Sequence, residues 1–346
     1  MTKRLHIIYW KNGKGLELDA GILAQIAQGA GYEVSLSETR NPGHYGKLFS
    51  DHVATRWHNW NLKRKLLRQA RSSLSRENRP LYDVAICLED VTPVAFQIAT
   101  KTVLIPNQEW FKKSHVGKIP DFDAVFCKSR LAETIFEAAG AQARYIGFST
   151  RVPTPERGDS PDFSRFLHIA GRSFMKGTRV VVEAWSRHPE WPALTILGTG
   201  GHELGGLPPN VLLIDRYLNE GERQHLQATH GIHVCPSESE GYGHTIAEGM
   251  ALGAVVVTTD APPMNELIGR DRGYLVAASR QKPMGLDHCY NVAVRDLETA
   301  IEKLLTTSLE ERAKLGREAK RHFAQSDKFF RSAFLESLNE LAGVGP

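Results

Sequence analysis

The segment from Cys235 to Asp260 constrains the fold more than any other part of the chain. An apolar run that ends at Cys235 leads into a polar loop with Gly241 and Gly243, then into a short helix-forming segment and the apolar run 254–257. Strand, loop, helix and strand in this order predict one βαβ step of a parallel sheet. A helix N-terminus that follows bare glycine amides attracts anions, phosphate in particular. The segment therefore predicts an anion site at the edge of a sheet.

Strand-like and helix-like segments alternate over most of the chain and predict two α/β domains. The 346 residues exceed the roughly 250 to 300 at which a single core stops growing. A proline-rich, charged stretch without periodicity separates the two runs, and we interpret it as a linker. We expect an N-terminal domain at 1–150, the linker at 151–164, a C-terminal domain at 165–325 and a last helix at 326–346, which begins after a break near Ser326 and packs back on the N-terminal domain.

Composition and net charge are those of an ordinary globular protein. Apolar residues make up 41% of the chain and charged residues 24%, and the formal net charge is +4. No apolar run approaches the roughly 18 residues that a membrane-spanning helix needs, and the N-terminus leads into a strand-length run instead of a secretory signal. The four cysteines lie far apart and show no metal-ligand spacing. We therefore expect a cytoplasmic protein without a bound metal.

Several short motifs give the C-terminal half a resemblance to a known family. Glu240 and Glu248 have the spacing E-x7-E, and the block 236–267 around them contains Glu-Gly-Tyr-Gly, Glu-Gly-Met-Ala and Gly-Ala-Val-Val-Val-Thr-Thr-Asp. Gly171-Arg172 and Lys176-Gly177 match a donor-phosphate loop. The chain thus resembles the retaining GT-B glycosyltransferases of the group 1, family 4-like superfamily. The resemblance implies an α/β fold of two Rossmann-like domains, whose parallel sheets face across a cleft, with a C-terminal helix that crosses back to the N-terminal domain.

The resemblance also implies which residues hold a nucleotide-diphosphate sugar. Arg172 and Lys176 are assigned to the diphosphate, whose negative charge grows as the glycosidic bond breaks, so cations there act mainly on the transition state. Glu240 is assigned to hydroxyls of the transferred sugar and Glu248 to those of the ribose. We name Glu240, Arg172 and Lys176 as catalytic candidates. The donor-binding candidates also include Gly13, Gly15, Gly241, Tyr242, Gly243, His244, Thr245 and Glu248.

Several of these candidates have simpler explanations. Thr245-Ile-Ala-Glu248 has the form of a capping box, in which Glu248 only ties back the start of a helix. The two cations could belong to a solvated loop, and Glu240 could be an exposed loop acid. His244 stands where relatives carry an apolar residue, so it either contacts the donor or packs. The sequence leaves these alternatives open.

The N-terminal half matches the family only in outline, by the Gly13 to Gly15 loop and the helix after it. Relatives carry a histidine at the strand end that here reads Ile105 to Trp110, and none is present. Polar residues nevertheless follow the predicted strands, where open α/β sheets bind ligands. We therefore assign the acceptor side to Glu89, Asp90, Asn107, Gln108 and Glu109.

The resemblance implies transfer of a sugar to an acceptor hydroxyl with retention of anomeric configuration, without a metal or other cofactor. Because Glu240 is used on hydroxyls, no carboxylate is left as a nucleophile, and we favour front-face attack over double displacement. Two other functions share the architecture, a sugar-nucleotide epimerase and a non-catalytic sugar-nucleotide-binding module. No pattern in the sequence selects the sugar, the base or the acceptor.

Positive charge is concentrated in one segment, residues 56–79, which holds eight Lys or Arg and one acid. The simplest interpretation is a solvated helix. Trp57 and Trp60 among the cations also suit an anionic glycan or a membrane surface that carries lipid-linked acceptors, which would make the protein peripheral at the inner membrane face. A nucleic-acid acceptor is the third interpretation, because these side chains neutralise phosphates and stack on bases.

Overall fold

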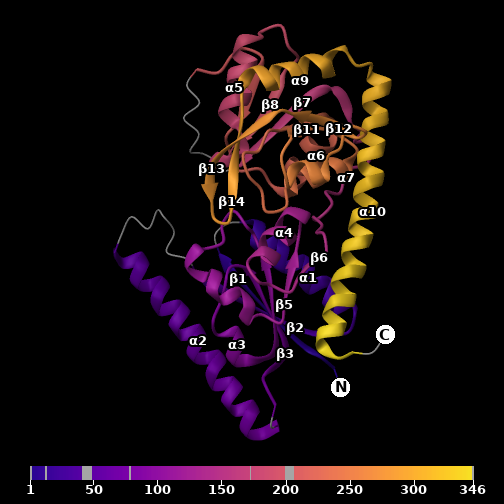
Figure 1. The fold of residues 1–346 in the computed structure, drawn as a ribbon. Coiled ribbons are helices and arrows are strands. Elements are labelled where there is room, and N and C mark those ends of the chain that lie inside the picture. The colour runs from indigo at the N-terminus through magenta and orange to yellow at the C-terminus, as the bar shows by residue number, and fades with distance from the viewer. Residues whose placement is uncertain are drawn as a thin grey trace. The chain divides into compact units, whose positions relative to one another are not determined.

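The protein consists of two compact units (Figure 1). A computed structural model describes residues 2–11, 14–40, 49–77, 79–171, 173–198 and 206–344. Unit 1 comprises Met1–Phe148 and Lys328–Pro346, and unit 2 comprises Ser149–Asp327. Each unit has its own six-stranded sheet. Over the described ranges, no helix is both long and apolar enough to cross a lipid bilayer.

Unit 1 is a parallel sheet in the order β2-β1-β3-β4-β5-β6, as the alternating pattern predicted. The inner strands are near-continuous apolar runs because both of their faces are covered. The strands are β1 (Arg4–Lys11), β2 (Glu33–Arg40), β3 (Tyr82–Glu89), β4 (Ala99–Pro106), β5 (Ala124–Cys127) and β6 (Ala143–Tyr145). The helices are α1 (Lys14–Gly29), α2 (Phe49–Glu77), α3 (Ala95–Ile98), the 3-10 segment η1 (Lys113–Asp121) and α4 (Arg130–Ala138).

Unit 2 is a parallel sheet in the order β12-β11-β10-β7-β8-β9. Its core packs Trp185 against Phe166 and Trp191. The strands are β7 (Asp162–Gly171), β8 (Leu194–Gly198), β9 (Val211–Ile214), β10 (His230–Cys235), β11 (Val255–Thr259) and β12 (Gly273–Val276). The helices are the 3-10 turn η2 (Phe174–Lys176), α5 (Thr178–Arg187), α6 (Glu220–Thr229), α7 (His244–Leu252), α8 (Met264–Leu267) and α9 (Val294–Thr306).

Each sheet has one point at which the chain reverses its direction of travel across the sheet. In unit 1 the chain goes from β1 outward to β2 and then returns to β3 on the other side of β1. In unit 2 it goes from β7 to β9 and returns to β10, which pairs with β7. Loops that follow two such neighbouring strands diverge and leave a crevice, which is where doubly wound proteins bind ligands.

Two features differ from the sequence prediction. The antiparallel hairpin of β13 (Ala278–Met284) and β14 (Asp287–Val292) was not predicted; its turn contains Gly285 at φ 55°. The last helix, α10 (Leu309–Ala342), is continuous, so the break predicted near Ser326 is wrong. Helical side-chain spacing continues through that point, and Phe330 and Phe334 are fully buried after it. Residues of α10 from Lys328 onward belong to unit 1.

Candidate functional site

The reversal point of unit 2 brings a lysine and a glutamate into contact. Lys176 lies at the end of η2, in the loop after β7, and Glu240 lies in the loop after β10. Lys176 Nζ is 2.5 Å from Glu240 Oε1, and Ser237 Oγ donates a 2.7 Å hydrogen bond to the same oxygen. Both charged side chains are largely buried, with 18% and 12% of their surfaces exposed. The structure therefore joins two candidates that are 64 residues apart in the sequence.

Electrostatics favour the charged form of this lysine. Burial opposes the charge, but the adjacent Glu240 carboxylate outweighs burial and raises the pKa of Lys176 above its usual value. The nearby thiol of Cys235 behaves differently, because burial raises its pKa to about 12. The site thus holds an ammonium–carboxylate pair beside a thiol that stays protonated and is a poor nucleophile.

Close backbone packing fixes the two loops against each other. Gly177 adopts φ 69°, and a Cβ atom at this position would lie 2.3 Å from the carbonyl oxygen of Pro236. The N–H of Glu238 donates to the carbonyl of Met175 at 2.8 Å, and its own carbonyl accepts from the N–H of Tyr290 in the hairpin. The unpredicted hairpin therefore supports the loop that carries Glu240.

Threonine side chains of β11 hold the same loop from the other side. Thr258 Oγ1 donates to the carbonyl of Cys235 at 2.8 Å, and Thr259 Oγ1 donates to that of Ser237 at 2.6 Å. Both threonines are fully buried. Buried hydroxyls need a partner, and here they find it in carbonyls at the end of β10 and in the loop that follows. The run Val-Val-Val-Thr-Thr therefore ends in two supports for the site.

Glu248 lies inside helix α7 and does not close a capping box. The helix begins at His244, its N-cap is Gly243, and no side chain caps it. Glu248 Oε2 instead accepts hydrogen bonds from Arg223 Nη1 at 3.2 Å and Gln227 Nε2 at 2.6 Å. The capping explanation is therefore wrong, because Thr245 is already a helical residue. Among the described residues, Oε1 accepts no hydrogen bond and stays available to a ligand.

Sequence reasoning missed Arg223 and Gln227. They stand four residues apart on α6, so they share one face of that helix, and they also bond each other at 2.9 Å. That spacing was visible in the sequence, but the acid they would hold lies on another helix 21 to 25 residues later. Only the packing of α6 on α7 identifies their partner.

The first turn of α7 follows the loop that carries Glu240. The first intrahelical bond runs from the N–H of Ala247 to the carbonyl of Gly243, so the N–H groups of residues 244–246 have no partner within the helix. Gly243 adopts φ 102°, which a side chain disfavours. His244 Nδ1 lies 2.9 Å from Thr150 Oγ1, and its ring meets the Tyr242 ring edge-on at 5.5 Å.

Two of the candidates, Arg172 and Gly13, lie outside the described residues. Gly15 is the second residue of α1 and has open space around it, so it is helical and not part of the predicted glycine loop. Gly241 is buried between Glu240 and Tyr242.

Two acceptor candidates of unit 1, Glu89 and Asn107, belong to a chain of polar contacts at the carboxyl ends of its strands. Asn107 Nδ2 donates to Glu89 Oε2 at 3.3 Å, and Asn107 Oδ1 accepts from Lys128 Nζ at 2.9 Å. Lys128 also contacts Asp19 of α1 at 2.5 Å. Gln108 and Glu109 are buried nearby in sequence, with 0% and 4% exposed. The structure adds Lys128 and Asp19 to this group, and neither was a candidate.

Asp90 belongs to a different set of contacts. Its carboxylate is 2.7 Å from His115 Nδ1 and 3.0 Å from Lys112 Nζ, and it is 4% exposed. Neither His115 nor Lys112 was predicted, because they follow the strand-end motif by several residues and carry no motif of their own. No histidine lies in the strand end 105–110, but one reaches the neighbouring strand end from η1.

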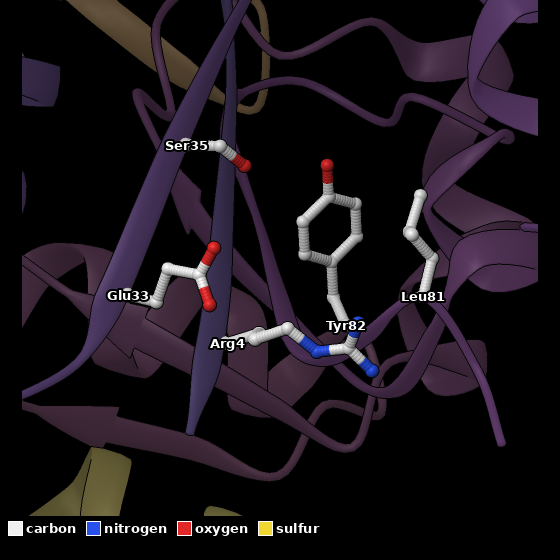
Figure 2. Close-up of a pocket in the computed structure, with 5 residues that line it drawn as sticks. All are labelled: Arg4, Glu33, Ser35, Leu81 and Tyr82. Atoms are coloured by element: carbon white, nitrogen blue, oxygen red, sulfur yellow. The ribbon is translucent and has the colours of Figure 1, made fainter. Parts of the chain in front are cut away.

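A hollow of about 150 Å³ lies at the opposite edge of the unit 1 sheet (Figure 2). It is lined by residues at the start of β1, β2 and β3 and by the residue before β3, namely Arg4, Glu33, Ser35, Leu81 and Tyr82. Beside it His6 stacks on Tyr82 at 4.4 Å and contacts Ser35 Oγ at 2.6 Å. Because ligands of doubly wound sheets bind at the carboxyl ends, we do not assign this hollow to the site.

The described part of the chain contains no group of three or more His, Cys, Asp or Glu side chains arranged to hold a metal ion. An Asp-x-Asp pair does occur at Asp121 and Asp123. These carboxylates have protein partners, Lys118 for the first at 3.2 Å and Lys101 for the second at 2.7 Å. Structural contacts therefore account for both.

Residues 165–289 match the family model described as Glycosyl transferases group 1. The matched segment contains Lys176 and Glu240, which pair at the reversal point of unit 2, and also Glu248 of α7. This matched segment, here called the group 1 domain, ends within β14, so the family model covers most of unit 2 and none of unit 1. No curated protein matches the sequence.

Solved structures resemble the whole chain, including the part outside the group 1 domain. Anabaena HepE in complex with UDP and glucose has a TM-score of 0.69 and 14% identity, over 97% of this chain and 99% of that one. Sucrose-phosphate synthase from Thermosynechococcus elongatus has a TM-score of 0.70 and 13% identity, over 99% and 100%. An E. coli structure described as trehalose-6-phosphate with UDP-2-fluoro glucose has a TM-score of 0.66 and 12% identity, over 99% of this chain and 100% of that one. The chain therefore has the GT-B fold that its sequence predicted.

Proposed function

We propose that the protein is a glycosyltransferase that moves a sugar from a nucleotide-diphosphate sugar to an acceptor hydroxyl. The observation that carries this proposal is the contact between Lys176 and Glu240 at the reversal point of unit 2, inside the group 1 domain. An ammonium in a loop of the same site as a helix N-terminus suits a diphosphate, and a carboxylate suits sugar hydroxyls. HepE, which shares the fold, was solved with UDP and glucose.

In this proposal, Lys176 acts on the leaving group. Negative charge grows on the diphosphate as the glycosidic bond breaks, and a fixed cation in a largely buried site stabilises that charge more than water does. The positive end of the helix dipole at the start of α7 adds to this effect. Arg172 is proposed for the same role on the basis of the sequence motif alone. When donor binds, the diphosphate takes over Lys176, and the sugar hydroxyls donate to Glu240.

Glu248 is proposed to hold the ribose. Arg223 and Gln227 both bond its Oε2 atom, which fixes the plane of the carboxylate. Oε1 then remains to accept from a ribose hydroxyl. His244 and Thr245, which are partly exposed at the start of α7, are proposed to line the donor next to it.

We further propose retention of anomeric configuration by front-face attack, without a metal cofactor. A double displacement needs a nucleophile at the anomeric carbon. The Glu240 carboxylate is held by Lys176 and Ser237, and the thiol of Cys235 stays protonated. The departing phosphate oxygen would then take the acceptor proton while the acceptor oxygen bonds to the anomeric carbon on the same face. In place of a metal, the positive charge of Lys176 offsets the negative charge of the diphosphate.

A ligand screen tests the proposal. The melting temperature is measured with a panel of nucleoside diphosphates and their sugars in the presence of EDTA; a donor at 100 times its dissociation constant adds about 2.7 kcal/mol to stability. Donors that stabilise the protein are then incubated with glycoside acceptors, and NMR reads the anomeric configuration of the product. Transfer with retention supports the proposal. Binding without any donor turnover would favour a binding module, and a changed sugar still attached to its nucleotide would favour an epimerase.

The basic segment is proposed to bind an anionic membrane surface that presents the acceptor. Five residues of α2 lie at spacings of three and four and share one face of the helix over about 21 Å: Trp57, Trp60, Arg64, Arg68 and Arg71. All five are exposed, the tryptophans by 66% and 51%, and Arg64 stacks on Trp60 at 4.3 Å. Tryptophan beside arginine suits a headgroup boundary.

The opposite face of α2 is packed, which explains why these five side chains face outward. Leu66 and Ala70 are buried, and Asn59 donates to and accepts from the backbone of Arg40 on the edge strand β2 at 2.6 and 2.8 Å. Flotation with vesicles containing anionic lipid, against neutral vesicles and single-stranded DNA, tests the proposal. Trp57→Ala with Trp60→Ala should abolish flotation. Binding to DNA but not to anionic vesicles would favour a nucleic-acid acceptor. The proposed location at the cytoplasmic face of a membrane would then be wrong.

A further inference from the structure

The reversal point of unit 1 carries its own set of polar side chains. β1 and β3 are neighbours in the sheet, and the chain departs from them in opposite directions. Trp10 lies near the end of β1, and Asp90 directly follows β3. Lys112 and His115 come from the segment after β4, at the same edge. The place where a doubly wound sheet binds its ligand therefore brings together Trp10, Asp90, Lys112 and His115, here called the Asp90 cluster.

Asp90 fixes the orientation of the histidine. Its Oδ1 atom accepts from the N–H of Val91 at 2.8 Å and contacts His115 Nδ1 at 2.7 Å, while Lys112 Nζ lies 3.0 Å from Oδ2. A carboxylate only accepts hydrogen bonds, so Nδ1 carries the proton. In the neutral imidazole, Nε2 is then a bare acceptor. His115 keeps 29% of its side chain exposed, and no described residue bonds Nε2.

A second polar atom of the cluster also lacks a partner. The indole Nε1 of Trp10 is buried, and among the described residues it donates no hydrogen bond. Lys112 Nζ lies over the Trp10 ring at 4.1 Å, so the lysine joins the ring to Asp90. A buried N–H without an acceptor costs free energy unless a ligand or water supplies one. The cluster therefore offers one unused donor and one unused acceptor.

The backbone around the cluster is held in place on both sides. Glu89 has φ 72°, the positive-φ non-glycine residue among the described residues, and such a conformation costs of order 1–3 kcal/mol. It turns the chain at the end of β3, immediately before Asp90. The segment with His115 is anchored by Phe111, which is buried against Phe136 at 5.2 Å, and by the fully buried Ile119. Strain beside a rigid support is typical of a ligand site.

We propose that the Asp90 cluster binds the acceptor, and that His115 Nε2 accepts a hydrogen bond from a hydroxyl of a neutral sugar residue. The proposal rests on the glycosyltransferase function above and names an acceptor-binding group of residues in unit 1. Asp90 and Lys112 are positioning residues, since they hold the imidazole. The charges of Asp90 and Lys112 cancel, which favours a polyol over a phosphate at the cluster. A negatively charged group attached to the acceptor would instead bind the exposed tryptophan and arginine side chains of α2.

Three substitutions of His115 separate binding by Nε2 from support of Asp90. His115→Asn keeps an N–H near the Nδ1 position for Asp90 but removes the acceptor at Nε2. His115→Gln places an oxygen near the Nε2 position, and His115→Ala removes both. Lys118→Ala, three residues further along η1 and exposed, is the matched control. The donor is the nucleotide sugar with the largest thermal shift, and the acceptor probes are neutral octyl hexosides and hexose 6-phosphates.

We expect His115→Ala and His115→Asn to raise the acceptor KM at least tenfold for the neutral glycosides, with the donor thermal shift and donor KM unchanged. His115→Gln should recover most of the affinity, and Lys118→Ala should match the wild type. Ligand-observed NMR with the same glycosides gives the result even where turnover is slow. The proposal is overturned if His115→Asn behaves as wild type, or if wild type binds only the hexose phosphates or neither probe. If no nucleotide sugar raised the melting temperature of the wild-type protein, the proposed function itself would be overturned.

Discussion

The reversal points of the two sheets hold charged groups in different ways. In unit 2, a lysine and a glutamate from the loops after β7 and β10 neutralise each other directly, and both are largely buried. In unit 1, Asp90 is divided between Lys112 and His115, and the lysine remains 42% exposed. A buried pair that releases one partner to a ligand suits a charged diphosphate. An oriented imidazole with a bare nitrogen suits a neutral hydroxyl. One sheet architecture thus supports two kinds of recognition, because the loops and not the strands carry the chemistry.

The largest expected difference between the units is in catalysis. Lys176→Ala and Glu240→Gln should each lower kcat/KM by about 10²- to 10³-fold, the typical effect of removing one group that stabilises transition-state charge. Initial rates of transfer over a range of donor concentrations provide the measurement. Arg187→Ala, which removes an exposed cation of the same unit, should leave the rate unchanged. Wild-type rates in both site variants would show that the reaction centre is not at this reversal point.

Acid should destabilise unit 2 more than unit 1. Burial lowers the pKa of His6 in unit 1, and of His230 and His233 in unit 2, each to about 4. Between the unfolded value near 6.5 and about 4, the unfolded chain binds these protons and the native chain does not. Stability is therefore fully present above about pH 6.5 and falls as the pH is lowered toward 4, by roughly 1 kcal/mol per pH unit for each histidine.

Urea unfolding at a series of pH values measures this slope. His6→Asn should reduce the slope by the contribution of about one proton. The double substitution of His230 and His233 should reduce it by the contribution of about two. A slope that does not respond to any of the three buried histidines would mean that they are protonated without unfolding.

Glycine substitutions should lower the free energy of unfolding more in the closely packed loops of unit 2 than at positions with open space around them. Gly177→Ala should lower the free energy of unfolding by about 2 kcal/mol or more, because its φ is 69° and the new Cβ would lie 2.3 Å from Pro236 O. Gly158→Ala has a comparable φ of 104° but open space, so about 1 kcal/mol is expected from the backbone alone. In unit 1, Gly15→Ala should be neutral or stabilising. Equal losses at positions 177 and 158 would contradict the close packing of the two loops.

The smallest effect is expected at the ribose carboxylate. Glu248→Gln should weaken binding of a nucleoside diphosphate about tenfold, or about 1.4 kcal/mol, because one oxygen remains to accept while the charge is lost. Isothermal titration calorimetry measures the dissociation constant. Asp260→Asn, which alters a partly exposed acid of the same unit, is the control. Unchanged affinity in Glu248→Gln, with a lower melting temperature, would assign the residue to the support of α6 alone.

Local elements were predictable wherever their signals lie within one stretch of chain. The alternation of strand-like and helix-like segments predicted α/β units, and both units have this alternation. Helical periodicity and apolar runs determine such elements through contacts between neighbouring residues. The hairpin of β13 and β14 was missed because its first strand is exposed and polar, so it lacks the apolar run on which the prediction relied.

The candidate residues of unit 2 were predictable, but their partners were not. Glu240 and Glu248 stand out because their motif lies within one βαβ step. That Glu240 pairs with Lys176, and that Arg223 holds Glu248, depends on which strands and helices become neighbours. The capping box at Thr245 was wrong for the same reason. The helix begins one residue earlier, and a neighbouring helix supplies better donors to the carboxylate.

The sequence by itself determined the fold class, the position of the group 1 domain and the acids at its centre, because local periodicity and short motifs encode them. Tertiary structure alone decided what those acids touch and brought Asp90, Lys112 and His115 together across 25 residues. The physical reason is the order of strands in each sheet. Parallel strands end at a common edge, and the point where the chain reverses selects which loops meet. No spacing along the chain records that choice.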